Sequence, residues 1–375
     1  MKYNIIMNIQ PANEDWEILL KFLPEGWEER AYELGALKRR KKIKSPEILL
    51  RVLLIHFADG KSLRTTAAYA RESEICDIND VALLHRLRVS EDWLHWMVME
   101  LQKELKGSAL PENTNKKYRI RLVDGTCVSE QGSKGTDWRI HYCFQLNNLR
   151  CDYFQMTGPK IGESFERYPV EEGDLMVGDR GYCNRNGIMY VLKKGGEVMI
   201  RFHSTILPLH MRNGNKLQVL EKLRSLDNGE AGDWDVWFKS PEDKQLIKGR
   251  LCSVRKTKEA IELAKRDICR KAAKNGIKTK PETLEYAEYI TIFTTVNRHI
   301  YNGRDILNLY RGRWQIELVF KRLKSIVGVG CLPKHNNESS KAWLYGKMLV
   351  ALLSERLYQE AEFFSPWGYP LQYPR

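Results

Sequence analysis

Two aspartates stand at comparable places in the sequence, each directly after a short apolar run. Asp124 follows the apolar residues of YRIRLVDGT (118–126), and Asp179 follows those of DLMVGDRGY (174–182). A short apolar run that meets glycine and aspartate indicates a buried strand that ends at a turn. Carboxylates at such positions lie at the edge of a sheet, next to each other if the strands are neighbours. Asp-Gly is also a common turn pair, so either motif alone could be a simple turn former.

A third carboxylate, Glu317, lies in LYRGRWQIELVFKRLKSIVG (309–328), which is predicted to belong to one long helix from about 303 to 328. At 100° per residue, four polar side chains share an arc of about 60° beside the apolar face: Tyr310, Arg313, Glu317 and Lys324. The alternative is ordinary pairing of Arg313 with Glu317 on an exposed helix, which contributes only tenths of a kcal/mol.

The segments around the two aspartates predict one alternating unit. Strands are expected at 118–126, 138–148, 151–157 and 174–182, and helices at 163–169 and 184–195. The order is therefore β-β-β-α-β-α, with an aspartate at the ends of the first and fourth strands. Two such motifs in this order favour a shared site over two unrelated turns.

The segment from about 196 to 296 is predicted to be a largely β insertion. Several stretches alternate, a basic stretch at 256–280 reads as a solvated helix, and EYITIFTTV (288–296) is a strand. Trp234 and Trp237 have two interpretations. They could stack on an extruded base, since every base has a π-face, or they could pack in a half-buried strand.

The first hundred or so residues are predicted to be helical. Apolar residues recur with a period of three to four at 14–23, 46–57 and 91–105. The basic run at 37–44 is either a solvated linker or an arm that contacts phosphates. The segments 60–70 and 81–94 are compatible with a helix-turn-helix-like arrangement that contacts DNA, or with plain helical packing.

Composition narrows the class of protein. A chain of 375 residues predicts two or three domains, and 61 Lys and Arg against 48 Asp and Glu leave a net charge of +13. That excess favours polyanionic partners such as nucleic acid. We find no apolar run that could span a membrane, no secretion signal, and no Cys or His spacing typical of a zinc site. The sequence therefore predicts a cytoplasmic protein.

The spacing Tyr310-x2-Arg313-x3-Glu317-x6-Lys324 resembles the YREK signature of DDE transposases of the insertion sequence 4 family. The VDGT and GDRGY segments are similar to the first and second acidic motifs of that family. The resemblance covers about 118–330, with the motifs in the right order.

The resemblance implies a fold class and a division into domains. The fold class is α/β: a ribonuclease H-like core, which is a mixed sheet flanked by helices, with the β insertion between the second aspartate and the glutamate. An all-helical domain precedes it. The expected domains are an N-terminal helical DNA-binding domain (1–110), the catalytic core (118–195 and 297–360) and the insertion (196–296).

The resemblance also implies an activity and its residues. Asp124, Asp179 and Glu317 would be catalytic and would ligate two Mg²⁺ ions, for which Mn²⁺ is expected to substitute. Such ions suit in-line displacement at phosphorus and take hard oxygen ligands. Five further residues are expected to contact DNA: Tyr310, Arg313, Lys324, Arg180 and Arg201. For Arg180 and Arg201, surface salt bridging is the alternative.

The expected partners are double-stranded DNA, as terminal inverted repeats and as target, and a second copy of the chain in a synaptic complex. No membrane partner is expected, and the place of action is the bacterial nucleoid. A phosphatase of the haloacid dehalogenase type is excluded because Leu122 stands where its nucleophilic aspartate would be. A structure-selective nuclease and a non-catalytic DNA-binding protein on the same fold remain as alternatives.

Overall fold

A computed structural model describes most of the chain: residues 13–106, 117–130, 132, 135, 137–147, 150–227, 229–325, 328–329, 331–332 and 336–363. Contacts divide the chain into two compact units. The first comprises Met1–Ser108, Cys127–Asp137 and Phe320–Arg375, and the second comprises Ala109–Thr126 and Trp138–Val319. The three expected domains were defined by their functions, and a division by contacts does not test functions. The three domains therefore stay a prediction.

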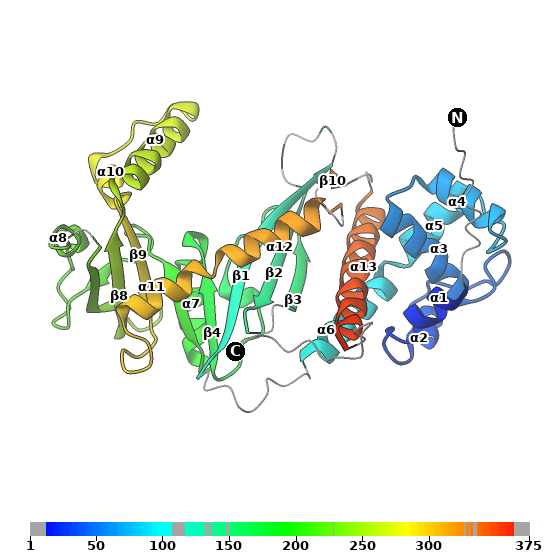
Figure 1. Cartoon of the computed structure of the whole chain (residues 1–375), viewed down its shortest axis with the longest axis horizontal. Helices are drawn as coiled ribbons and strands as arrows, with labels where there is room; N and C mark the ends of the chain where they lie inside the picture. Colours follow the sequence, from blue (N-terminus) through cyan, green and yellow to red (C-terminus); the bar gives the residue numbers. More distant parts are fainter. Residues whose placement is uncertain are drawn as a thin grey trace, which may run out of the picture. The chain divides into compact units, whose positions relative to one another are not determined.

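Helices build the first unit (Figure 1). Their bounds are α1 (Asn13–Leu20), α2 (Trp27–Glu33), α3 (Pro46–Asp59), α4 (Leu63–Glu72), α5 (Asp80–Val89), α6 (Glu91–Lys106) and α13 (Asn337–Phe363). The start of α3 shows why the sequence predicts these helices: Pro46 occupies the first turn, and Ser45 Oγ accepts a hydrogen bond from the Ile48 N–H at 3.3 Å. The last helix, α13, packs on α3, α5 and α6. Among the described residues, no helix combines the length and apolar character needed to cross a membrane.

A mixed sheet is the frame of the second unit. Its strands lie in the order β3-β2-β1-β4-β5-β9-β8-β7-β6. Their bounds are β1 (Arg119–Glu130), β2 (Trp138–Gln145), β3 (Arg150–Thr157), β4 (Asp174–Gly178), β5 (Glu197–Arg201), β6 (Leu209–His210), β7 (Ala231–Lys239), β8 (Leu246–Arg255) and β9 (Tyr289–Thr294). The end of β1 belongs to the first unit, where it pairs in parallel with β10 (Cys331–Leu332).

The two strands that carry the aspartates are parallel neighbours. Strand β1 pairs with β4 from Arg119 opposite Asp174 to Leu122 opposite Val177. The expectation that β1 ends at Gly125 is wrong, because β1 continues to Glu130. What ends near Asp124 is the pairing of β1 with β4, whereas β2 remains its neighbour on the other side.

The segment predicted to be an insertion (196–296, the inserted segment) extends the same sheet. Strand β5 pairs in parallel with β4 on one side and antiparallel with β9 on the other. Strand β9 in turn pairs with β8, and β8 pairs with β7. Helices are more abundant here than the predicted β character suggests: α8 (Val219–Arg224), α9 (Lys258–Lys274) and α10 (Pro281–Tyr286). Of these, only α9 was expected. The segment is therefore mixed in its elements but continuous with the core sheet.

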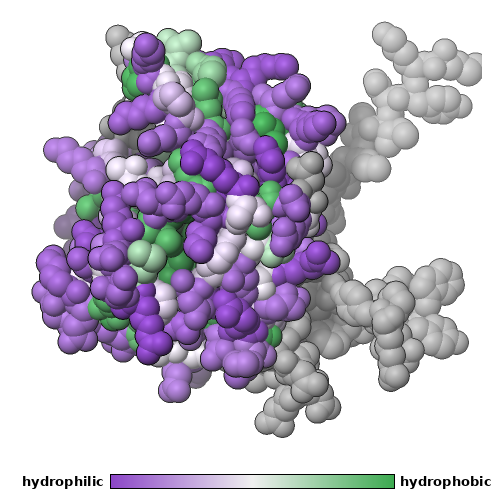
Figure 2. Space-filling model, turned by 90° about the vertical axis from the view of Figure 1, so that its left-hand side faces the viewer, coloured by the Kyte–Doolittle hydropathy of each residue, from purple (hydrophilic) through white to green (hydrophobic). Residues whose placement is uncertain are grey.

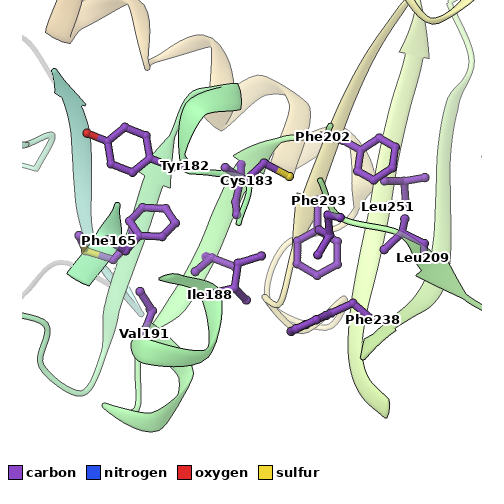
Figure 3. Packing of buried hydrophobic residues seen from close by; sticks show 14 of the residues in the cluster. Phe165, Tyr182, Cys183, Ile188, Val191, Phe202, Leu209, Phe238, Leu251 and Phe293 are labelled. Carbon is purple, nitrogen blue, oxygen red and sulfur yellow. The ribbon is translucent and has the colours of Figure 1, made fainter. Parts of the chain in front are cut away.

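One hydrophobic core runs along this sheet (Figure 3). Its first part gathers around α7 (Arg185–Lys193) and the short 3-10 helices η1 (Phe165–Arg167) and η2 (Arg180–Tyr182). The second part lies in the inserted segment, where Phe238 and Phe293 meet edge to face with ring centroids 5.7 Å apart. Trp234 packs against this core and is half-buried, which supports the packing interpretation of that side chain.

The predicted long helix from 303 to 328 is two helices, α11 (Gly303–Arg311) and α12 (Trp314–Ser325). At the link, the N–H groups of Gly312 and Arg313 donate to carbonyls three residues back, at 2.9 and 3.0 Å. Glycine is a poor helix former, and a Cβ at Gly312 would lie 3.3 Å from Leu146 Cδ2. The single-helix wheel therefore does not hold across the link, and Arg313 lies outside both helices.

A buried ion cluster fastens β1 to β4. The Arg121 side chain is 1% exposed and pairs with Asp152 of β3 and with Asp174, where Nη1 lies 2.9 Å from Oδ2. Arg119 Nε reaches the other oxygen of Asp174 at 2.5 Å. The two arginines thus hold the start of β4 against the strand that carries Asp124.

Candidate active site

Asp124 and Asp179 lie together at one edge of the parallel strands. The register of β1 and β4 places both at the same level of the sheet, two residues past the last pair. Each carboxylate also organises its own turn. Asp124 Oδ1 accepts a hydrogen bond from the Gly125 N–H at 2.8 Å, and Asp179 Oδ1 accepts one from the Gly181 N–H at 2.7 Å. The roles of turn former and of site residue are therefore compatible.

A fourth carboxylate, Glu163, lies beside them and was not anticipated. A Cβ at Gly125 would stand 2.7 Å from Glu163 Oε1, and one at Gly181 would come even closer to Oε2. Only glycine leaves room for this approach. In the sequence, the glycines near the two aspartates indicated that another group could approach closely. Nothing in the spacing of the residues pointed to Glu163 as that group.

Two carboxylates of this cluster, Asp124 and Glu163, have a raised pKa. Burial raises the pKa of Asp124 to about 7, and the charges of Asp179 and Glu163 add to that effect, whereas the Gly125 N–H and Arg313 oppose it. Burial and then the charge of Asp179 also raise the pKa of Glu163. Among the described residues, the Glu163 carboxylate makes no hydrogen bond or ion pair. The cluster is thus short of positive charge.

Glu317 reaches the cluster through Arg313. Arg313 Nη1 lies 3.7 Å from Asp124 Oδ2, and Nη2 pairs with Glu317 Oε1. The Glu317 side chain is 58% exposed. In the part of the chain that the structure describes, no three Asp, Glu, His or Cys side chains are gathered closely enough to hold a metal ion. The convergence of Asp124, Asp179 and Glu317 therefore stays a prediction.

Tyr310 and Arg201 lie close to the two aspartate motifs. The Tyr310 hydroxyl donates to the carbonyl of Gly178, next to Asp179, at 3.3 Å, and burial raises the pKa of Tyr310 to about 12. Arg201 Nη2 donates to the carbonyl of Tyr289 at 3.1 Å. Burial lowers the pKa of Arg201, and the nearby charges of Arg180 and Arg313 contribute to the lowering.

A pocket of about 170 Å³ continues this basic region. Arg180, Arg201 and His203 line it together with the aromatic rings of Tyr286 and Tyr289. Burial, followed by the charges of Arg201 and Arg180, lowers the pKa of Lys256 to about 8. A region in which several cations lie close together favours an anion between them.

Lys324 differs from the other expected DNA contacts. It lies near the end of α12, is exposed, and belongs to the first unit by its contacts. Its role as a DNA contact stays a prediction.

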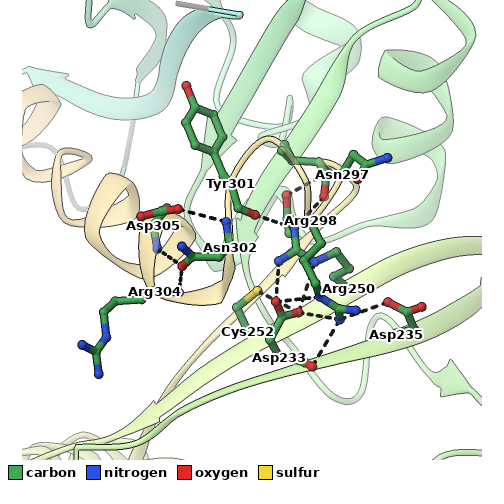
Figure 4. A network of polar contacts seen from close by, with 12 residues as sticks. Asp233, Asp235, Arg250, Cys252, Asn297, Arg298, Tyr301, Asn302, Arg304 and Asp305 are labelled. Carbon is green, nitrogen blue, oxygen red and sulfur yellow. Dashed lines mark hydrogen bonds and ion pairs between the residues drawn. The ribbon is translucent and has the colours of Figure 1, made fainter.

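A polar network fixes the start of α11 (Figure 4). Asp233 accepts hydrogen bonds from Arg250 Nε at 3.1 Å and Nη2 at 2.5 Å, and from Arg298 Nε at 3.0 Å. Arg250 Nη1 in turn donates to the carbonyls of Val296 and Tyr301, at 2.8 and 2.9 Å. The loop before α11 is thereby tied to β7 and β8, and α11 carries Tyr310.

The network predicts a stability difference that depends on pH. Arg298 and Arg250 outweigh burial and hold the pKa of Asp233 at about 2, below its ordinary value. The stabilisation is therefore fully present above about pH 4 and is lost as the pH falls toward 2. We expect Asp233→Asn to reduce the unfolding free energy at pH 7 by about 1–2 kcal/mol. Urea titrations of both proteins between pH 7 and pH 3 measure this difference, which should narrow at the acid end; a constant difference would contradict the assignment.

Comparison with known proteins decides the family. A protein-family model described as "Transposase DDE domain" matches residues 157–353, which include Asp179, Tyr310 and Glu317. The match covers more than half of the 375 residues. The chain belongs to the DDE transposases. Membership implies a ribonuclease H-like fold, and it confirms the family predicted from the YREK spacing and the two acidic motifs.

Whole-length relatives of this DDE transposase carry transposase names. The chain is 30% identical over 361 residues to "Putative transposase InsL for insertion sequence element IS186A" of Escherichia coli strain K12, covering 95% of this chain and 97% of the relative. It is 30% identical over 362 residues to "Transposase for insertion sequence element IS421" of Escherichia coli, with the same coverage. A more distant relative, "Transposase for insertion sequence element IS231F" of Bacillus thuringiensis subsp. israelensis, is 28% identical over 49% of this chain and 41% of its own length.

Proposed function

We propose that this DDE transposase binds the ends of its insertion sequence, cleaves the DNA there and joins the 3′-OH ends to target DNA. A cut-and-paste route is the form we favour. Support comes from family membership and from the relatives' names. The observation that carries the proposal is the placement of Asp124 and Asp179 together on parallel strands, at the edge where their pairing ends.

The acidic cluster fits divalent cations. Its donors are carboxylate oxygens, which Mg²⁺ prefers. Burial, with the charges of Asp179 and Glu163 added to it, raises the pKa of Asp124, and a bound cation would offset that effect. In this proposal Asp124, Asp179 and Glu317 would hold two Mg²⁺ ions, or Mn²⁺ in their place. When bound, such ions activate the entering oxygen and stabilise the leaving oxygen at phosphorus.

Glu317 is free to join the aspartates at small cost. Its carboxylate is exposed and pairs only with Arg313 among the described residues. An exposed ion pair contributes about 0–1 kcal/mol, so separating it is inexpensive. Arg313 therefore stands in as the positive partner of Asp124 and Glu317, and it can release both when a phosphate offers it two oxygens.

The basic side chains behind the cluster would hold the DNA backbone. Tyr310 remains protonated far above neutral pH and can donate its hydrogen bond to a phosphate. Arg313 suits bidentate contact, and Arg180 and Arg201 line a pocket that favours an anion. Lys324 would add a point charge. Each of these five roles is part of the proposal.

The first unit would recognise the terminal inverted repeats. Helices α4 and α5 follow each other closely, and their N-caps, Ser62 and Asn79, accept hydrogen bonds from the Thr65 and Ala82 N–H groups. The basic run at 37–44 is largely exposed. Two copies of the chain would bring two DNA ends together in the synaptic complex.

End mapping tests the proposed function. Purified protein is incubated with a plasmid that carries its element and flanking DNA, with Mg²⁺ or with EDTA. We expect Mg²⁺-dependent cuts at the element boundaries that leave 3′-OH ends, and joining of these ends when target DNA is added. Cutting at DNA structures without joining would instead support a nuclease, and binding without cutting would support a DNA-binding protein.

A further inference from the structure

Helix α9 is an exposed helix on the inserted segment. None of its residues is buried, although its inner side is anchored. Lys265 Nζ lies 2.6 Å from Glu288 Oε1, and Ile268 lines the pocket next to Tyr286. In Figure 1, α9 and α10 project beyond the ends of β8 and β9. Its outer side is therefore open to a partner.

The outer side and the turn after it are strongly basic. Six exposed cations lie between 266 and 280, against one acidic residue, Asp267. We call these six residues the basic ridge: Arg266, Arg270, Lys271, Lys274, Lys278 and Lys280. Asp267 pairs with Arg270 at 2.8 Å and with Lys271 at 3.8 Å. In the described part of the chain, the other four make no ion pair.

Helix stability alone does not account for the ridge. Like charges four residues apart destabilise a helix by a few tenths of a kcal/mol per pair, and Arg266, Arg270 and Lys274 form two such pairs. The helix dipole favours cations only in the last turn, whereas Arg266 lies before that turn and Lys278 and Lys280 lie beyond the helix end. A polyanionic partner would relieve this repulsion.

The surface chemistry favours nucleic acid over protein. Figure 2 shows that hydrophilic residues prevail on the face at this end of the unit, with hydrophobic ones in small separate spots. Leu263 and Ile277 are 62% and 64% exposed, but single exposed apolar residues are common and need no partner. The segment 256–280 contains no aromatic residue, so it lacks the stacking groups of single-strand binders.

We propose that the basic ridge binds the phosphate backbone of duplex DNA without reading its sequence, an inference that rests on the proposed function for the presence of DNA. Arg266, Arg270 and Lys274 span about 12 Å along the helix. Over that length a duplex carries about seven phosphates. Arginine and lysine contacts to phosphate position a protein on DNA but do not specify bases.

A salt titration of DNA binding tests the ridge. The full-length protein is measured in EDTA, without cleavage, against a duplex of random sequence. The test variant carries Arg266→Gln, Arg270→Gln and Lys274→Gln. A matched control carries Lys194→Gln, Lys216→Gln and Lys222→Gln, which removes the same charge from exposed positions elsewhere in the unit.

The slope of log K against log salt concentration is negative, and we expect it to become less negative by about 2–3 in the ridge variant. This change corresponds to about 0.9 for each lost phosphate contact. The control should change it by less than about one. A conservative variant, Arg266→Lys with Arg270→Lys, should keep the wild-type slope. Equal slopes for the ridge and control variants would overturn the proposal.

Two further measurements distinguish DNA binding by the ridge from a dimer contact and from the proposed function. Sedimentation without DNA should show the same oligomeric state for the wild type and the ridge variant; a dimer lost in the variant would mean that a second copy docks there, and would overturn the proposal. Since the titration involves no metal and no cleavage, failure of end cleavage rejects the proposed function alone. An unchanged slope in a protein that cleaves rejects the ridge alone.

Discussion

We expect Asp124→Ala to abolish Mg²⁺-dependent nicking of DNA that carries the element ends, with a loss on the order of 10³-fold or more. The reason is that Asp124 is half-buried in the acidic cluster and lies at the same level of the sheet as Asp179. Binding to duplex DNA should stay within about twofold, because it depends on basic side chains. Nicking is measured on supercoiled plasmid, and binding by fluorescence anisotropy in EDTA.

A matched control removes an acidic residue outside the cluster. Asp243 is an exposed residue of the same unit, in the turn between β7 and β8. Asp243→Ala should nick at the wild-type rate. Nicking by Asp124→Ala at the rate of this control would remove Asp124 from the site, and the same comparison applies to Asp179→Ala and Glu317→Ala.

Arg121→Ala should reduce the unfolding free energy by about 3–5 kcal/mol, the usual cost of removing one partner from a buried ion cluster. The variant leaves Asp152 and Asp174, which are 3% and 0% exposed, without their shared partner. Arg119 would still compensate Asp174 in part. Chemical denaturation at pH 7, followed by circular dichroism, measures the loss.

Arg119→Ala is the comparison for this effect. Arg119 contacts the same carboxylate but is 29% exposed, so water compensates its loss more easily. We expect a reduction of about 1 kcal/mol. Similar losses for the two variants would show that burial of the ion cluster does not determine its contribution.

The sequence predicts that Asp124 and Asp179 lie at one edge of the sheet, because the signal for each lies within its own short segment. An apolar run, a glycine and an aspartate recur twice, and the strands they form become parallel neighbours. The helices of the first unit are equally local, since periodicity and caps such as Ser45 define them. Such signals need no knowledge of distant partners.

Other features depend on contacts that the chain makes across long distances. Gly312 breaks the predicted helix where Leu146 packs against it, and Leu146 is 166 positions earlier in the chain. Glu163 joins the acidic cluster through the space left by Gly125 and Gly181. The glycines are local signals, but nothing in their own segments points to Leu146 or Glu163, so only the folded chain reveals these contacts.

The continuity of the sheet has a consequence for truncation. Strand β9 pairs with β5 on one side and with β8 on the other. Deleting β6 to β8 and their connections would leave β9 as a bare edge strand with unpaired N–H and C=O groups. Such an edge recruits strands from other molecules. A shortened chain should therefore aggregate, even though the acidic residues and their strands would all still be present.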